Sequence, residues 1–177
     1  FSHVARVAPA MRVEPSSGKV MGDEDAVAAA VKEVAGVSGA APVIDEVALA
    51  VYRQYHLPVS IQGVPAGYDS IVDYSQTIID GAVTSERMST LGAGLLSVGA
   101  ANGLMAFPGG YDFVHLYVPR RKGRINPALP SPAFREASVT MHAVYPADDK
   151  AADMPPVVMS VALAWALLHD ASCARRG

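Results

Sequence analysis

The segment from residue 91 to residue 124 constrains the fold of this chain more than any other part of the sequence. Its first twenty residues, LGAGLLSVGAANGLMAFPGG, are apolar and include six glycines. A PGG turn signal then leads into YDFVHLYV, whose alternation is typical of a strand. Glycines one helical turn apart let another backbone approach closely. We therefore expect tight packing, within the chain or between subunits, at Gly92, Gly99 and Gly103.

A basic sequence, RRKGR, follows the predicted strand. It holds four of the 14 lysine and arginine residues, although the whole chain carries a formal net charge of −3. Clustered cations can contact phosphates in a sequence-independent way. They can equally form ion pairs with an acidic partner or remain solvated in a loop, and the sequence leaves these three alternatives open. The residues concerned are Arg120, Arg121, Lys122 and Arg124.

Hydrophobic periodicity and turn residues predict an α+β fold that is rich in helix. About five helices are expected to pack with a small, mostly antiparallel sheet. The predicted helices cover residues 22–36, 43–56, 68–81, 84–105 and 155–170. The predicted strands cover residues 58–65, which prolines would confine to a sheet edge, 111–118 and 136–146.

The length of 177 residues suits one domain, and neither an internal repeat nor a long linker is apparent. The chain begins with Phe1 and shows no signal peptide, so we expect a processed product or part of a longer polypeptide. No apolar run reaches the roughly 20 residues needed to cross a bilayer, so no membrane segment is expected. The single cysteine, Cys173, excludes an internal disulfide and fits a reducing, intracellular setting.

Candidate catalytic and metal-binding residues are few. His115 and His142 lie on the two strongest predicted strands and would become neighbours if those strands paired, with Asp112 as the nearest third metal ligand. Structural histidines explain the same pattern. His169 and Cys173 share a helix face but lack a suitably placed orienting residue. We therefore expect no enzyme activity, no cofactor and no metal site.

Four sequence stretches resemble the capsid proteins of victoriviruses, the totivirus-type double-stranded RNA viruses of fungi. They are YDSIVDYSQTIIDGAV, LGAGLLSVGAANGL, GGYDFVHLYVPRRKGRI and SVTMHAVYPADDKAA, within residues 68–170. The resemblance implies an α-rich structural protein that assembles as asymmetric dimers into an icosahedral shell. That shell encloses the genome and its polymerase.

The resemblance also implies partners and a location. Partners would be copies of the chain itself or of the parent coat protein, together with double-stranded RNA through the basic sequence. The location would be the virion and the host cytoplasm. The chain is shorter than a complete coat protein, so residues 1–177 would be a single domain or a fragment of a larger capsid-type polypeptide. The family offers no catalytic motif to transfer.

The alternative interpretation belongs to another class of protein. The chain would be a small non-catalytic or site-sharing fragment, or subunit, of an intracellular metabolic enzyme complex. Residues 92–110 would then form a loop beside the substrate, and His115 would act as the acid or base. This alternative predicts a concave pocket next to His115.

Overall fold

The computed structural model describes residues 9, 11–17, 21–110, 112–119, 134–147 and 154–169. Strands dominate these residues. The strands are β1 (Ile44–Tyr52), β2 (Tyr55–Val64), β3 (Asp80–Gly81), β4 (Ala93–Ser97), β5 (Phe113–Pro119), β6 (Phe134–Tyr145) and β7 (Pro156–Ser160). The helices are α1 (Glu24–Lys32), α2 (Ser85–Leu91), α3 (Val98–Leu104) and α4 (Val161–Leu168), with 3-10 turns at Tyr68–Ser70 and Tyr74–Gln76.

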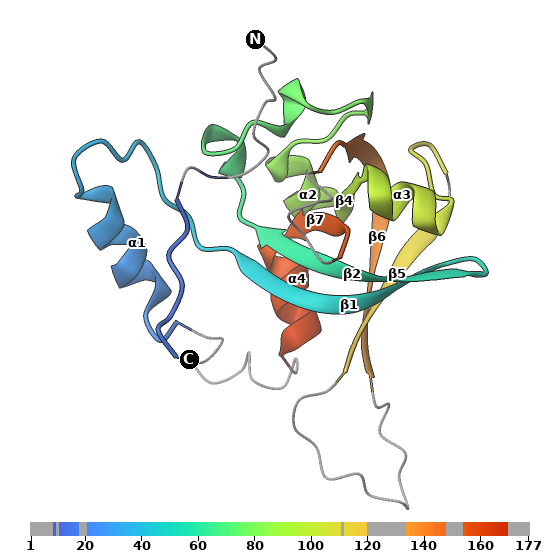
Figure 1. The fold of residues 1–177 in the computed structure, drawn as a ribbon, viewed down its shortest axis with the longest axis horizontal. Helices are drawn as coiled ribbons and strands as arrows, with labels where there is room; N and C mark the ends of the chain where they lie inside the picture. Colours follow the sequence, from blue (N-terminus) through green and yellow to red (C-terminus); the bar gives the residue numbers. More distant parts are fainter. Residues whose placement is uncertain are drawn as a thin grey trace, which may run out of the picture.

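Six of the strands close into a barrel of mixed parallel and antiparallel pairs (Figure 1). The order around the barrel is β6-β4-β7-β2-β1-β5, and the β5–β6 pair completes the ring. The short strand β3 lies outside the ring, beside the last residues of β6. The expectation of a helix-rich α+β fold with a small sheet is therefore wrong.

Strand alternation explains why the predicted helix over residues 43–56 is absent. In β1 the side chains of Ala48 and Ala50 are buried inside the barrel, whereas Val47 and Leu49 point outward and are exposed. The run VALAVY fits a helix by composition, but its small residues are also the ones that fit a narrow barrel interior. The strand at 58–65 is likewise not an edge, because β2 pairs with β1 on one side and with β7 on the other.

The two longest predicted helices are each replaced, in part, by a strand. Residues 84–105 form α2, β4 and α3, and residues 155–170 contain β7 followed by α4. A serine marks the junction from strand to helix in both cases. The Ser97 hydroxyl accepts a hydrogen bond from the Ala100 amide, and the Ser160 hydroxyl accepts one from the Leu163 amide, each at 3.2 Å. These bonds are N-caps, which start a helix where the strand ends.

Residues 65–92 cross the outer surface of β4 and β7 and form a second apolar layer there. Their buried side chains include Tyr68, Tyr74 and Met88. The Tyr74 and Tyr145 rings meet edge to face, with centroids 5.7 Å apart. The predicted helix over residues 68–81 is wrong, since these residues form two 3-10 turns and β3.

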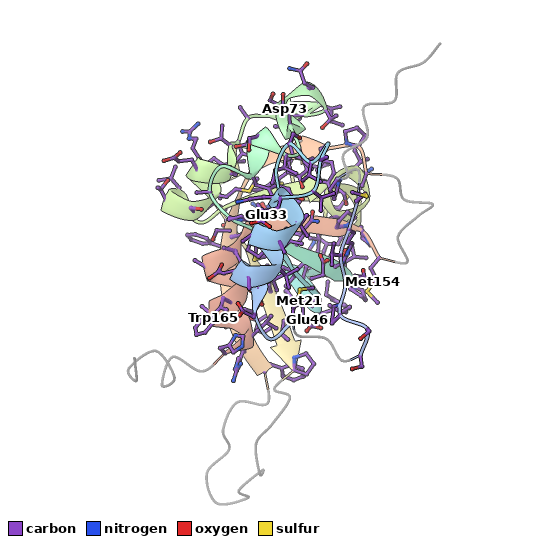
Figure 2. The ribbon with its side chains drawn as sticks, turned by 90° about the vertical axis from the view of Figure 1, so that its left-hand side faces the viewer. Met21, Glu33, Glu46, Asp73, Met154 and Trp165 are labelled. Atoms are coloured by element: carbon purple, nitrogen blue, oxygen red, sulfur yellow. The ribbon has the colours of Figure 1, made fainter. Side chains whose placement is uncertain are left out.

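Four predicted elements are confirmed. They are the helix within 22–36, the strand at 58–65 and the two strands that contain His115 and His142. The helix α1 contains no buried residue, and it lies to one side of the barrel, nearest the viewer in Figure 2. Of the described helices, none combines the length and hydrophobicity that a membrane crossing requires.

The barrel has a pseudo-two-fold axis. Exchanging β1 with β5, β2 with β6 and β4 with β7 reproduces the strand order and the direction of every pair. The axis passes through two pairs of equivalent residues. They are Ala50 with Leu116, and Leu95 with Val158.

Each half of the barrel therefore consists of a hairpin, a connection and a strand that leads through a serine into a helix. The helices α3 and α4 are equivalent, and their buried residues share one core with the inward side chains of the strands. No internal repeat was predicted from the sequence, but the structure contains one.

Candidate functional site

The basic residues predicted to contact phosphate or a partner lie outside the described residues. They are Arg120, Arg121, Lys122 and Arg124. The strands β5 and β6 that flank this segment form a regular antiparallel pair as far as Pro119 and Phe134. Contact with RNA or with a second subunit through these cations stays a prediction.

The three glycines predicted to allow close packing occupy different environments. A Cβ at Gly103 would lie 2.7 Å from Leu57 Cδ2, so α3 approaches β2 closely at this point. Gly92 has a φ of +61° and ends α2 in the left-handed conformation, with open space around it. Gly99 lies half-buried in α3. Their role between subunits stays a prediction.

His115 lies on the outer face of the barrel rather than in a pocket. Its Nδ1 atom is 2.7 Å from Glu136 Oε1 and 3.1 Å from Ser138 Oγ. Both partners therefore meet the same ring nitrogen, whereas a catalytic relay needs the acid on one nitrogen and the nucleophile on the other. The predicted loop beside a substrate is instead β4 and α3, so the enzyme-subunit alternative is wrong.

The residues weighed as candidate metal ligands do not come together. His115 pairs with Ser138, and β5 ends its pairing before it reaches His142. Asp112 binds the Arg53 guanidinium, with Oδ2 2.7 Å from Nε and 2.6 Å from the terminal nitrogen. The part of the chain that the structure describes contains no group of three potential metal ligands.

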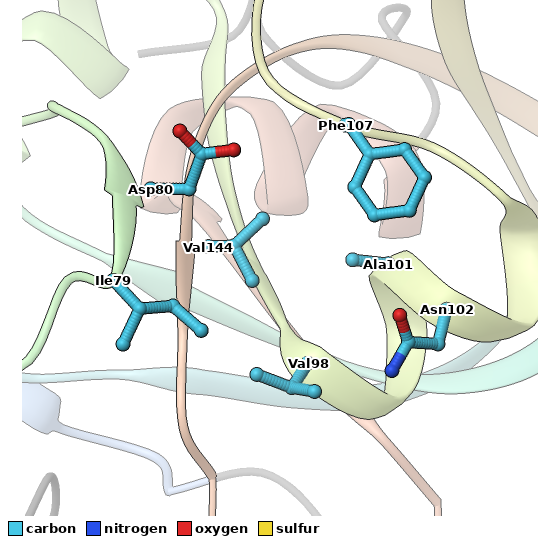
Figure 3. Close-up of a pocket in the computed structure, with 7 residues that line it drawn as sticks. All are labelled: Ile79, Asp80, Val98, Ala101, Asn102, Phe107 and Val144. Carbon is cyan, nitrogen blue, oxygen red and sulfur yellow. The ribbon is translucent and has the colours of Figure 1, made fainter.

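A small hollow opens between β3, the outer end of β6 and α3, with a volume of about 180 Å³. Figure 3 shows Ile79 and Asp80 on one side, Phe107 and Asn102 on the other, and Val144 and Ala101 between them. Ile79 is 63% exposed and Phe107 is 50% exposed. Both are therefore large apolar side chains at the rim of a concave surface.

The symmetry-equivalent place, where α4 meets β2, is filled. Leu96 and Met159 are equivalent, because each directly precedes the capping serine of its half. Gly63 pairs with Met159 and Val144 pairs with Leu96, so Gly63 is equivalent to Val144. A Cβ at Gly63 would lie 2.6 Å from Ala164 Cβ and 3.4 Å from Ile44 Cβ. The helix α4 therefore sits directly on β2 and leaves no space.

The residues that fill that place have counterparts that all line the hollow. Val161 and Ala164 of α4 correspond to Val98 and Ala101 of α3, counted from the capping serines. Ile44 is the partner of Gly63, and the partner of Val144 is Asp80. Val144 carries a side chain where its counterpart has none, and α3 packs less extensively on β6 than α4 does on β2. The hollow therefore lies where the pseudo-symmetry is broken.

A second hollow of about 570 Å³ lies next to Gly81 of β3. Glycines form most of its wall, and the floor is β6. Gly81 has a φ of +77°, and a Cβ there would lie 2.0 Å from the carbonyl oxygen of His142. No other residue type fits this position. The lining residues are Gly81, Pro108, Gly109, Gly110, Thr140, Met141 and His142.

Asp80 is the acidic residue among those that line the two hollows, and neither lining contains lysine or arginine. Its side chain is exposed, and the ion pairs of the described residues do not include it. The first hollow also has the Asn102 amide, across from Asp80, and the second has the His142 imidazole, whose Nδ1 is 3.2 Å from the Thr140 carbonyl oxygen. The site therefore combines apolar surface with one free negative charge.

Sequence patterns did not predict this site. Ile79 and Asp80 fall inside a predicted helix, and Pro108, Gly109 and Gly110 were expected to form a turn. The enzyme alternative placed residues 92–110 beside a substrate, but without residues 79–80 or β6. One signal was available. The stretches LLSVGAANGL and VMSVALAWAL align without a gap and share serine, valine, alanine and leucine. This repeat would have shown that each of the two segments leads through a serine into a helix.

These features define a closed β-barrel with an apolar surface hollow. Neither a family model nor a curated protein matches the chain. Among solved structures, it is similar to the extracellular domain of the noncanonic ABC-type transporter YknZ from Gram-positive bacteria. The identity is 16% and the TM-score 0.47, over 78% of this chain and 63% of that one. This chain therefore spans less than two thirds of that structure, and no function is taken from so distant a similarity.

The coat-protein interpretation is wrong. The resemblance implied an α-rich fold, whereas the described residues form a strand-rich barrel. The sequence comparisons match no viral protein. The icosahedral shell and the location in a virion and host cytoplasm are corrected with it.

Proposed function

We propose that this chain is a non-enzymatic binding domain that takes an apolar side chain of a partner protein into the hollow between β3 and α3. The observation that carries the proposal is the apolar hollow itself, flanked by the exposed side chains of Ile79 and Phe107. Concave apolar surfaces with a few polar groups are typical of binding sites. The equivalent place in the other half is packed, so closing this barrel does not require an open hollow.

The energy available from one side chain sets the expected strength of binding. Burying a leucine, isoleucine or phenylalanine side chain is worth about 1.5–3 kcal/mol. That corresponds to a factor of roughly 10–150 in the dissociation constant, because 1.4 kcal/mol is tenfold. A partner held by this anchor and a few polar contacts would bind reversibly.

A selection from a phage-displayed library of random linear peptides tests the proposal. We expect the selected peptides to share one large apolar position. Replacing the rim residue, Phe107→Ser, should weaken their binding at least tenfold by fluorescence polarisation, since the anchor loses one wall of its hollow. Met105→Ser is the matched control, because Met105 is 55% exposed on the same turn but does not line the hollow. It should leave the affinity unchanged within about twofold.

Two results would contradict the proposal. The first is a selection that yields no peptide whose binding depends on Phe107. The second is equal loss of binding in the Phe107 and Met105 variants, which would place the contact elsewhere on the turn. Circular dichroism of both variants shows whether the barrel is intact, because neither side chain is part of the buried core.

A further inference from the structure

We infer that the partner segment is an extended peptide that carries a lysine or arginine beside its apolar anchor, with the cation placed against Asp80. This inference rests on the proposed function, because it describes what occupies the same hollow. It concerns both hollows and the strand β3 beside them.

The shape of the site favours an extended backbone. The two hollows follow each other along β6, with Val144 in the lining of the first and His142 in the lining of the second. Between these residues the register of β6 with β4 shifts, because Gly94 pairs with Met141 and Leu95 with Ala143. Alternate side chains of an extended peptide point to the same side and lie about 7 Å apart. Two such side chains of one peptide can therefore enter the two neighbouring hollows.

The glycine wall lets a peptide backbone come close. Gly81, Gly109 and Gly110 are exposed and present only main-chain atoms to the second hollow. A helix is about 10 Å wide with its side chains, whereas a single strand is much thinner. A thin occupant fits a groove bounded by a two-residue strand and a turn.

The charge of the site selects the side chain next to the anchor. Asp80 is exposed at the rim of the first hollow, and no described cation pairs with it. Neither hollow has a lysine or arginine in its lining that would attract an acidic peptide. A cation beside the anchor would find a carboxylate without having to break an existing ion pair. Complementary charges of this kind set specificity more than affinity.

Synthetic peptides from the library selection test the inference. We expect a consensus with two anchors at positions i and i+2 and a cation next to the first. Replacing that cation with glutamine should weaken binding about three- to tenfold at low salt, and Asp80→Asn should weaken binding of the original peptide by the same factor. The two changes together should cost little more than either alone, because they remove one interaction. The effect should shrink at high salt.

The control variant is Asp25→Asn, which removes an exposed carboxylate from α1, far along the chain from both hollows. It should leave the binding of every peptide unchanged. If the peptides depend on Phe107 but not on Asp80, or if their anchors are spaced at i and i+3 or i+4, the inference fails while the proposed function stands. If no peptide depends on Phe107, both fail. Concentration-dependent self-association that Phe107→Ser abolishes would assign the hollow to a second copy and overturn the inference.

Discussion

The substitution Gly63→Ala tests the physical origin of the hollow. A Cβ at this position would lie 2.6 Å from Ala164 Cβ, which is 0.8 Å short of the 3.4 Å lower limit of ordinary contact. It would also lie 3.3 Å from the Val161 Cα atom, which belongs to the backbone of α4. No rotation of a side chain relieves this contact, so α4 itself would have to move away from β2.

The expected loss of stability can be worked out from two opposing effects. Overpacking a well-packed core costs about 1–3 kcal/mol. Replacing glycine with alanine also reduces the entropy of the unfolded chain, which returns about 0.4–1 kcal/mol. The net loss is about 1–2 kcal/mol, or a decrease in Tm of roughly 2–8 °C for a chain of this size.

Urea denaturation followed by circular dichroism gives the free energy of unfolding. Gly22→Ala is the matched control, since no atom lies within 4 Å of a Cβ there and its φ is not positive. That variant should be unchanged or slightly stabilised. The double variant Gly63→Ala/Ala164→Gly removes the short contact, and its stability should exceed the sum of the single changes by about 1–2 kcal/mol.

Two outcomes would refute this account of the packing. One is a Gly63→Ala variant as stable as the unaltered chain, which would mean that α4 can shift without cost. The other is a destabilised variant with no coupling to Ala164, which would place the strain elsewhere. In either case, close packing of α4 on Gly63 would not explain why only the α3 end carries a hollow.

Two further predictions concern buried polar groups. Ser97→Ala and Ser160→Ala should each lower the free energy of unfolding by about 1 kcal/mol, because each removes an N-cap. The two serines are equivalent and both are buried, so the two losses measured by urea denaturation should agree within about 0.5 kcal/mol. A large difference between them would contradict their equivalence. Burial raises the pKa of Tyr74 above its ordinary value of 10.0. The contribution of this neutral phenol to the free energy of unfolding is therefore fully present below pH 10. It is lost as the pH rises and the unfolded chain ionises, by up to about 1.4 kcal/mol per pH unit. The Tyr74 hydroxyl donates a hydrogen bond to Gln62 Oε1 at 3.2 Å, so Tyr74→Phe should lower the free energy of unfolding by about 1 kcal/mol at pH 8. Above pH 10 the stability of this variant should fall less steeply with pH than that of the unaltered chain, in the same assay. An equal fall in both proteins would contradict burial of Tyr74 as the cause.

Local patterns were sufficient where they had one structural solution. The run that contains Phe113 and Val118 alternates in a way that only a strand satisfies, and it became β5. The helix α1 was predictable from Asp23, whose carboxylate accepts a hydrogen bond from the Ala26 amide at 3.2 Å. Such signals depend on neighbours in the sequence, so they do not require knowledge of the fold.

Uniformly apolar runs were not predictable in the same way. Residues 155–170 lack alternation because β7 is buried on both faces, and a fully buried strand and a buried helix have the same composition. Only the position of Ser160 divides the run into its two elements. The same holds for Ser97 between β4 and α3, and the pattern S-V-x-x-A-x-x-L after both strands is the trace of that shared architecture.

The hollow depends on relations that no single segment contains. Gly63 and Val144 are 81 positions apart in the sequence, and they become comparable only through the registers of β2 with β7 and of β6 with β4. In the first half β1 continues to Ile44 and covers Gly63, whereas in the second half β5 begins at Phe113 and leaves Val144 to the short strand β3. The close packing of α4 on Gly63 shows that an end of this barrel can be filled, so the fold does not require the open end beside α3. The open end has a concave, apolar surface with one carboxylate, Asp80, and a surface of this kind supports binding of a partner.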